Sequence, residues 1–187
     1  MKRKRLTAIL AIELTPDRLR AVEMRVEGEA GVRAARTVNA PLALNVFSAE
    51  PDLSAREIRA QFDAAGVRAR ACALCLPVEN LLIQRVDLTG VPEEDVDSLI
   101  ALEAERAFPF APDEMLMAVS RGEEEGKRWA TLAAVPASHL APALEALRRA
   151  KLRVASVTPG VAALLDPGSD GPDAVLLAGE RAFDFAC

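Results

Sequence analysis

The sequence predicts an α/β domain, because short apolar segments bounded by turn residues alternate with segments of helical periodicity. Strands are expected at Ala71–Leu76 and Leu81–Leu88, and helices at Asp52–Gly66 and Ser138–Lys151, where apolar residues recur every three or four positions. A chain of 187 residues can form one domain with a smaller subdomain and bury a substantial core. Since 51% of the residues are apolar and only 4% are aromatic, that core must be packed mainly from Ala, Leu and Val.

A β-hairpin is expected at the start of the chain. Leu6–Glu13 and Arg18–Val26 predict two strands joined by Leu14–Asp17, in which Pro fixes φ and Asp can bond the nearby backbone. A third strand is expected within Arg33–Val46, with Pro41 at its edge or at a break, because proline cannot donate to a strand ladder. The first apolar run stops at an acidic residue without a cleavage site, so we do not interpret it as a signal peptide.

The helix expected over Asp52–Gly66 has marked ends. Ser54 and Glu57 have the spacing of a capping box, and Gly66 suits the left-handed position that closes a helix. The strand Ala71–Leu76 follows and is ended by a proline. Three strands, a helix and a strand is the order in which ribonuclease H-like and actin-like lobes begin, so the first part of the chain is expected to form such a lobe.

A second amphipathic helix is expected within Val91–Pro112. Acidic residues at Glu93–Asp95 complement the positive end of the helix dipole, and the helix is expected to end before Pro109, which cannot continue it. Phe108, Pro109 and Phe110 then form a rigid apolar corner. The residues on the predicted buried face are Val96, Leu99, Ile100, Ala104, Ala107 and Phe108.

A second β-hairpin is expected after this corner. Glu114–Ser120 and Arg128–Val135 are interpreted as strands joined by the acidic tip Arg121–Lys127, which we expect to be solvated rather than a docking site. The helix Ser138–Lys151 can be capped by its first residue, and Arg153–Val157 predicts the next strand.

The segment Leu102–Phe110, LEAERAFPF, resembles the Trp-Glu-Ala-Glu-x-(Tyr)-Ile-Pro-Phe segment of PilM-type proteins. These are actin-like cytoplasmic components of type IV pilus assembly, related to the cytoplasmic part of the type II secretion protein GspL. Leu102 and Ala107 stand where that pattern usually has aromatic residues. The flanking runs LLIQRVDLTGVPEEDVDSLI and ALEALRRAKLRVASVTPGVAALL are similar to the family as well, so the resemblance extends from about Leu6 to Leu165.

The resemblance implies a domain organisation for the whole chain. Residues 1–80 would begin an actin-like first lobe, and residues 81–135 would form an inserted strand-helix-strand-strand subdomain. Residues 136–165 would return to the first lobe through a helix and a strand. The turn-rich linker 166–172 would lead to residues 173–187, a hairpin that opens a second lobe. Most of that second lobe is missing, so we expect a truncated form, a fragment or a shortened homologue.

Actin-like ATPases hold phosphate in the turns of two hairpins, and both turns differ here. PilM-type proteins usually read Asp-Ile-Gly-Ser-Ser at the first turn, where glycine lets backbone N–H groups approach the phosphate. The first turn of this chain lacks glycine and includes a proline without an N–H; it consists of Leu14, Thr15, Pro16 and Asp17. At the second turn Gly179 follows Ala178, where an Asp is expected. We therefore expect no ATP turnover and no ATP or Mg²⁺ cofactor; the alternative is an actin-like ATPase whose second lobe is supplied separately.

Charge and hydropathy limit the partners. A net charge of −5 with a pI near 5.1 argues against nucleic acid, whose binders carry clustered basic surfaces. The basic run Lys2–Arg5 is interpreted as a solvated end, with a membrane-surface contact as the alternative. No apolar run approaches the ~20 residues that cross a bilayer. We expect a soluble cytoplasmic protein that is peripheral to the inner membrane through a partner.

The cysteines do not predict a metal or redox site. Cys72 and Cys75 have CxxC spacing, but residues three apart on a strand face opposite sides, so both are expected to be structural. Cys187 is the third cysteine and His139 the only histidine in the sequence, which leaves zinc short of ligands.

A ribonuclease H-like nuclease is a second enzymatic interpretation. It would need several carboxylates converging on two metal ions. Glu103 and Glu105 diverge on a helix, and Glu103 is better interpreted as a partner of Arg106. The remaining candidates for such a cluster are Glu13, Asp17 and Glu23.

The function implied by the resemblance is that of a scaffold. In PilM-type proteins a groove in the first lobe receives the short cytoplasmic tail of an inner-membrane partner of PilN type, held by strand pairing or apolar pockets. We expect the contacts near the apolar corner and the strand Leu81–Leu88; the residues concerned are Phe108, Pro109, Phe110, Ile83 and Arg85. A homo-oligomer and recruitment to another membrane complex are left open.

Overall fold

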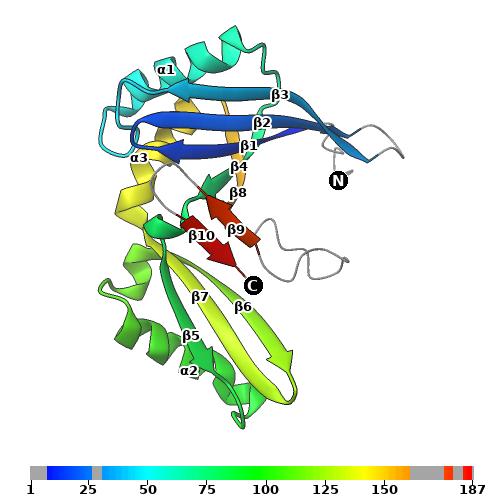
Figure 1. The fold of residues 1–187 in the computed structure, drawn as a ribbon. Coiled ribbons are helices and arrows are strands. Elements are labelled where there is room, and N and C mark those ends of the chain that lie inside the picture. Colours follow the sequence, from blue (N-terminus) through cyan, green and yellow to red (C-terminus); the bar gives the residue numbers. More distant parts are fainter. Residues whose placement is uncertain (1–7, 27–30, 161–174, 179–182, 187) are drawn as a thin grey trace, which may run out of the picture. The chain divides into compact units, whose positions relative to one another are not determined.

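The computed structural model describes residues 8–26, 31–160, 175–178 and 183–186. The chain divides into two compact units, residues 1–78 with 141–187 and residues 79–140 (Figure 1). We call them the five-stranded unit and the three-stranded unit, after their main sheets. Within the described residues, no helix is long and apolar enough to span a membrane.

The sheet of the five-stranded unit has the order β3-β2-β1-β4-β8. The strands β1 (Ala8–Thr15), β2 (Arg18–Val26) and β3 (Val32–Pro41) form an antiparallel meander. The strands β4 (Ala71–Leu76) and β8 (Arg153–Pro159) join it in parallel to β1. Parallel neighbours need a crossover between them, and helices supply it here. The expected order of three strands, a helix and a strand is therefore confirmed.

The core of this unit comes from alternate residues of the strands and one stripe of each helix. On β1, Leu10, Ile12 and Leu14 are fully buried while their neighbours are partly exposed, which is the period of a half-buried strand. The helix α1 (Pro51–Ala64) contributes Ile58 and Phe62, and α3 (Ala137–Arg149) contributes the fully buried Leu147 from its C-terminal part. All three side chains lie within these helices and are buried.

The two ends of α1 differ in how well they were predicted. Gly66 has φ +68°, and the N–H of Val67 donates to the Phe62 carbonyl at 2.9 Å, so the left-handed C-terminal cap is confirmed. The capping box is wrong. Ser54 is buried inside the helix, and the Glu57 carboxylate instead accepts the N–H of the loop residue Ala43 at 2.6 Å. Glu57 therefore makes a tertiary contact with the loop in place of the predicted capping interaction at the start of the helix.

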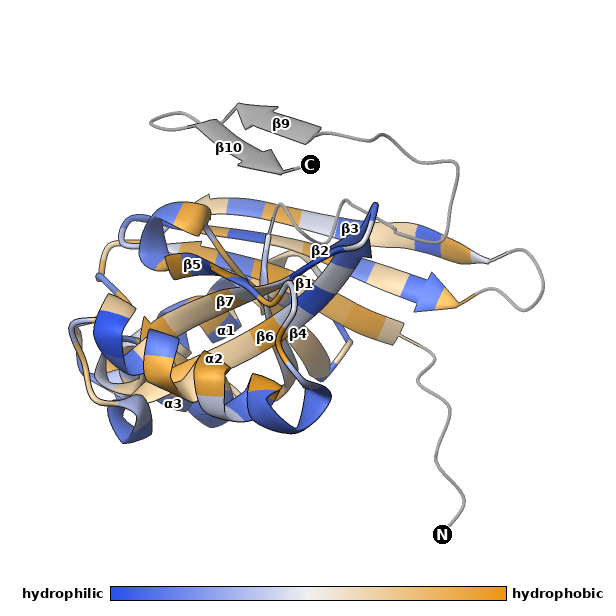
Figure 2. Ribbon diagram, turned by 90° about the horizontal axis from the view of Figure 1, so that it is seen from below, coloured by the Kyte–Doolittle hydropathy of each residue, from blue (hydrophilic) through white to orange (hydrophobic). Residues whose placement is uncertain are grey.

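The three-stranded unit consists of one helix on an antiparallel sheet with the order β5-β7-β6. The strands are β5 (Leu82–Asp87), β6 (Met115–Glu124) and β7 (Lys127–Pro136), and the helix is α2 (Glu93–Ala107). Apolar and polar residues alternate around α2 (Figure 2), as expected for a helix with one buried face. Two short 3₁₀ helices complete the unit, η2 (Val78–Asn80) at its start and η3 (Pro112–Glu114) before β6.

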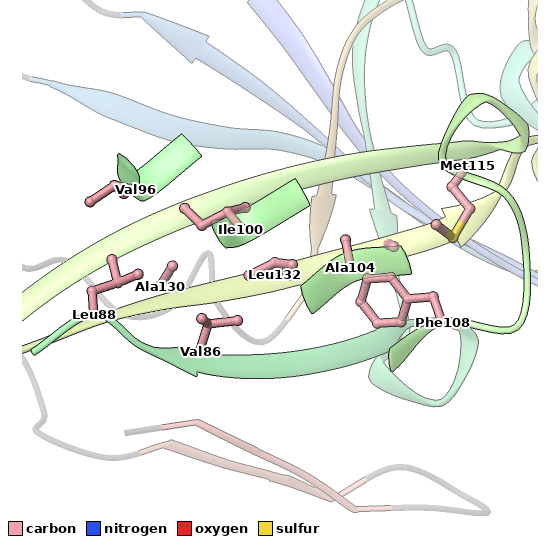
Figure 3. Packing of buried hydrophobic residues seen from close by; sticks show 10 residues of the cluster. Val86, Leu88, Val96, Ile100, Ala104, Phe108, Met115, Ala130 and Leu132 are labelled. Atoms are coloured by element: carbon pink, nitrogen blue, oxygen red, sulfur yellow. The ribbon is translucent and has the colours of Figure 1, made fainter. Parts of the chain in front are cut away.

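A single apolar cluster joins α2 to one face of this sheet (Figure 3). The expected buried stripe of α2 is confirmed at its centre, but Ala107 is exposed and Leu99 is only partly buried. The buried residues repeat every fourth position, and Ala107 lies about 100° around the helix from Phe108, off this stripe. The members of the cluster are Val86, Leu88, Val96, Ile100, Ala104, Phe108, Met115, Ala130, Leu132 and Ala134.

The β6–β7 hairpin is longer than expected, and its acidic tip is much shorter. Strand pairing continues to Glu124 and Lys127, and the turn is only Glu125-Gly126. Both turn residues have positive φ, +50° and +77°, which matches the twist of a two-residue hairpin. Arg121, expected in the tip, lies in β6 and pairs with Glu93 of α2 at 3.0 Å. The hairpin is therefore tied to the start of the helix.

The C-terminal predictions are tested only in part. The strands β9 (Val175–Ala178) and β10 (Phe183–Ala186) pair in antiparallel, which confirms the expected hairpin. The linker 166–172 and the turn residues 179–180 lie outside the described residues. The helix α3 starts at Ala137, so Ser138 lies in its first turn and is not its N-cap.

Candidate functional site

The predicted contact residues do not gather on one surface. Phe108 is 7% exposed and belongs to the core, so its side chain holds the three-stranded unit together. Phe110 is half-buried against the same cluster, and its ring meets the ring of His139 edge-on at 6.0 Å. Pro109 is exposed between the two phenylalanines. The apolar corner therefore closes one end of the core.

The other two predicted residues lie on the opposite face of the sheet. Ile83 and Arg85 alternate along β5 with Leu82 and Val86, which pack on the core, so they point away from α2. Ile83 is 51% exposed and lies opposite Ala133 of β7 in the strand register.

This second surface, the open sheet face, is built from side chains of all three strands. The strand register places Ala118, Ala133 and Ile83 side by side in one row and Gly122, Trp129 and Asp87 in another. The face consists of Ile83, Arg85 and Asp87 of β5, Leu116, Ala118, Ser120 and Gly122 of β6, and Trp129, Thr131, Ala133 and Val135 of β7. It combines apolar side chains with one stacked cation.

Trp129 lies flat on this face because Gly122 makes room for it. A Cβ atom at Gly122 would come within 2.6 Å of the indole ring, closer than any real contact. The Arg85 guanidinium stacks over the Trp129 ring, with its central carbon 4.3 Å from the ring centroid. The pair forms a partly exposed platform, and tryptophan and arginine are residue types enriched at protein interfaces.

The strand β6 gives this surface an unpaired edge. It is the outer strand of the order β5-β7-β6, and no strand of the described residues pairs with its far side. Its exposed apolar residues lie on both faces: Leu116 is 46% exposed, Met117 41% and Val119 42%. An apolar edge with free backbone groups is a template for an added strand. Sequence periodicity missed this site because β6 alternates little in hydropathy.

The first phosphate turn of the actin-like pattern has a different construction here. Pro16 has no N–H to offer, and Leu14 is fully buried. The Thr15 hydroxyl donates to a carboxylate oxygen of Asp17 at 3.0 Å, and the N–H of Leu42 donates to the Asp17 carbonyl at 2.8 Å. The turn therefore bonds to itself and to its neighbouring loop, and its residues do not fit the backbone cradle that a nucleotide phosphate requires.

The candidate nuclease carboxylates are engaged separately. Glu23 is 1% exposed on β2 and is held by arginines, while Glu13 pairs with Arg20 at 2.8 Å. Glu103 lies in the other unit, and its expected pair with Arg106 is confirmed at 3.3 Å. Among the described residues, no group of three His, Cys, Asp or Glu side chains is placed to hold a metal ion.

The two described cysteines sit as expected of strand residues three apart. Cys72 is fully buried, and burial raises the pKa of its thiol to about 11 despite the nearby charge of Arg153. Cys75 is only partly buried; desolvation and the Glu13 carboxylate raise its pKa too. Both thiols stay protonated near neutral pH, which does not favour redox chemistry.

Comparison with solved structures identifies the fold. A chain of a PilM–PilN type IV pilus biogenesis complex superposes with a TM-score of 0.67 over 83% of this chain and 48% of its own length, at 23% identity. The cytoplasmic domain of EpsL, an inner-membrane component of the type II secretion system of Vibrio cholerae, gives 0.62 over 94% of this chain and 66% of its own length, at 15% identity. The chain has a PilM-like and EpsL-like fold.

This finding confirms the expected resemblance at the level of the fold: the chain folds like a chain of the PilM–PilN complex and like the EpsL cytoplasmic domain. The chain spans about half the length of the PilM–PilN complex chain that it matches. No protein-family model matches this sequence, and the comparison with curated proteins gives no match.

Proposed function

We propose that this chain is a scaffold of a type IV pilus or type II-like secretion assembly, and that it binds a short tail of an inner-membrane partner of PilN type. The observation that carries the proposal is the structural likeness to a chain of a PilM–PilN complex. In this proposal the protein works on the cytoplasmic side and reaches the membrane through that partner.

The open sheet face and the β6 edge support a binding role. A peptide added along β6 would gain backbone hydrogen bonds from the edge and place alternate side chains against Leu116 and toward Trp129. We propose this placement in addition to Ile83 and Arg85, and keep the exposed Pro109 and the half-buried Phe110 as secondary contacts. Phe108 is left out because its side chain is committed to the core.

A calorimetric titration tests this proposal. The folded chain is titrated with the cytoplasmic-tail peptide of the membrane protein encoded beside it, and micromolar saturable binding is expected. Leu116→Asp should weaken binding at least tenfold, because a charge replaces an apolar contact. Leu102→Asp is the matched control, since Leu102 is similarly exposed at 49% but lies on α2. Equal loss in both variants, or no binding by the folded wild type, would contradict the proposal.

We also propose that the chain does not hydrolyse ATP on its own. The support is the self-bonded turn at Pro16 and Asp17. Phosphate release from Mg-ATP at the level of a buffer blank is the expected result. Turnover that appears when a separate chain supplies an intact second lobe would instead favour the actin-like ATPase.

A further inference from the structure

The five-stranded unit has a hollow of about 600 Å³ between α1 and the end of α3. Its charged lining is dominated by cations in a chain whose net charge is −5. We call it the basic hollow, and its charged residues are Arg56, Arg59, Arg70, Arg149 and Lys151, with Asp52 and Asp63. Positive charge is therefore concentrated here against the overall charge of the protein.

Two of these cations already have acidic partners. Arg149 pairs with Asp52, and Arg59 pairs with Asp63 at 2.8 Å. The three remaining basic residues are exposed and form no ion pair within the part of the chain that the structure describes; they are Arg56, Arg70 and Lys151. Like charges held around one hollow repel each other, which an anion bound between them would relieve.

Arg59 lines the hollow and is held on one side by Asp63. Its Nε and Nη2 atoms donate to the two carboxylate oxygens of Asp63, at 3.1 Å and 2.8 Å. Its Nη1 atom is buried and has no hydrogen-bond partner among the described residues. A buried donor on a charged group is costly when unpaired, so Asp63 satisfies the Arg59 guanidinium only in part.

Lys151 occupies a backbone position that normally belongs to glycine. Its φ is +62°, and the N–H of Leu152 donates to the Leu147 carbonyl at 3.0 Å, which closes α3 in the usual left-handed cap. A lysine here is strained relative to glycine. Such strain is typical of positions where the side chain serves another purpose, and this side chain borders the hollow.

Small residues leave the space open. Ala55 and Ala150 are buried at 5% and 3% exposure, and Ala60 lies one turn along α1. The volume lies within the range typical of small-ligand sites.

We propose that the basic hollow binds a phosphate group, carried by a free phosphorylated small molecule or by a lipid headgroup. A carboxylate needs one arginine fork, as Asp63 shows with Arg59. Phosphate has more charge and more acceptor oxygens, and so matches a hollow lined by several cations, three of which have no ion pair among the described residues. This site is independent of the open sheet face, which belongs to the other unit.

Titration of the ¹⁵N-labelled chain with inorganic phosphate and with pyrophosphate, at fixed ionic strength set by chloride, tests the proposal. We expect saturable amide shifts confined to residues around Arg56, Arg70 and Lys151. Arg56→Gln combined with Arg70→Gln should weaken binding about tenfold or more. The matched control Arg106→Gln removes an exposed cation from α2 and should leave the affinity unchanged.

The Lys151→Gly variant tests whether the Lys151 side chain contributes to phosphate binding, apart from any effect on stability. Glycine should keep or raise the melting temperature, because it suits φ +62°, while phosphate binding weakens.

Co-sedimentation with phosphatidylglycerol vesicles, compared with phosphatidylcholine vesicles, distinguishes a lipid headgroup from a free small molecule. Binding to phosphatidylglycerol vesicles that is lost in the Arg56/Arg70 variant supports a headgroup. Binding of soluble phosphate without binding to vesicles supports a small molecule. Absence of both, equal loss in Arg106→Gln, or tighter binding of an oligoglutamate peptide than of pyrophosphate would overturn the proposal.

Discussion

Glu23 is the clearest case in which one residue links distant parts of the five-stranded unit. Its carboxylate accepts from Arg25 at 3.0 Å, from Arg36 at 3.5 Å and from the backbone N–H of Arg68 at 3.3 Å. Burial alone would raise its pKa, but the bonds from Arg25 and Arg68 and the positive charges of Arg25 and Arg36 outweigh it, so the pKa is lowered.

The lowered pKa predicts how stability depends on pH. An unfolded Glu titrates near pH ~4.3, so the carboxylate contributes its full stabilisation above that value and loses it as the pH falls through the lower folded pKa. We expect Glu23→Gln to cost about 1–3 kcal/mol at pH 7, discounted because both arginines are partly exposed. Urea unfolding should show this difference shrinking toward pH 3. A difference that is constant from pH 7 to pH 3 would contradict the assigned role.

Phe108 is expected to behave as a core residue. Its ring is 7% exposed inside the cluster between α2 and the sheet, so Phe108→Ala removes buried area and leaves a cavity. A loss of about 3–5 kcal/mol in the free energy of unfolding is expected. Leu102→Ala, on the helix that ends just before Phe108, is the control, and because that side chain is 49% exposed it should change stability by less than about 0.5 kcal/mol. Comparable losses in the two variants would show that the core is wrongly assigned.

At the scale of elements, Gly122 and Trp129 give a test of the open sheet face. A methyl group at Gly122 would collide with the indole at 2.6 Å, so Gly122→Ala should displace the ring and cost about 1–3 kcal/mol. Trp129 is the only tryptophan of the sequence, so the red shift of its emission reports the displacement directly. Ser120→Ala, one position along the same face, should leave the emission unchanged. Unshifted emission in Gly122→Ala would refute the packing.

Much of this architecture could be predicted from local patterns. The bounds of β4 agree with prediction because Pro77 and a continuous apolar run mark them, and Gly66 identifies the end of α1. The predicted extent of the β6–β7 tip was wrong, because Arg121 was interpreted as a solvated charge. In the structure it pairs with Glu93, 28 residues earlier in the chain. Such pairs depend on tertiary placement, which periodicity does not contain.

The candidate sites were harder to predict for the same reason. The open sheet face joins Ile83, Leu116 and Trp129, which strand register brings together from separate segments. The basic hollow likewise joins α1 with the end of α3. Arg85 was predicted as a contact residue, and the structure adds that it stacks on Trp129. Helix and strand patterns give the elements, while a surface requires knowing which elements are neighbours.

At the scale of the whole molecule, the two compact units separate the proposed activities. The proposed peptide surface belongs to the three-stranded unit, and the altered phosphate turn belongs to the five-stranded unit. In a nucleotide-dependent actin-like ATPase the two would be coupled, because nucleotide binding would bias the conformation that accepts the partner. Under the proposed scaffold function, no such coupling is expected.

Partner binding is therefore expected to be independent of nucleotide. The dissociation constant of the tail peptide, measured by calorimetry with and without millimolar Mg-ATP, should change by less than about twofold. The reason is that Pro16 has no N–H to donate to a phosphate and the Thr15 hydroxyl already donates to Asp17. The Leu116→Asp variant controls for heat unrelated to the peptide surface. A tightening of tenfold or more, about 1.4 kcal/mol of coupling, would mean that nucleotide engages this chain by a route other than that turn, and would favour the ATPase over the scaffold.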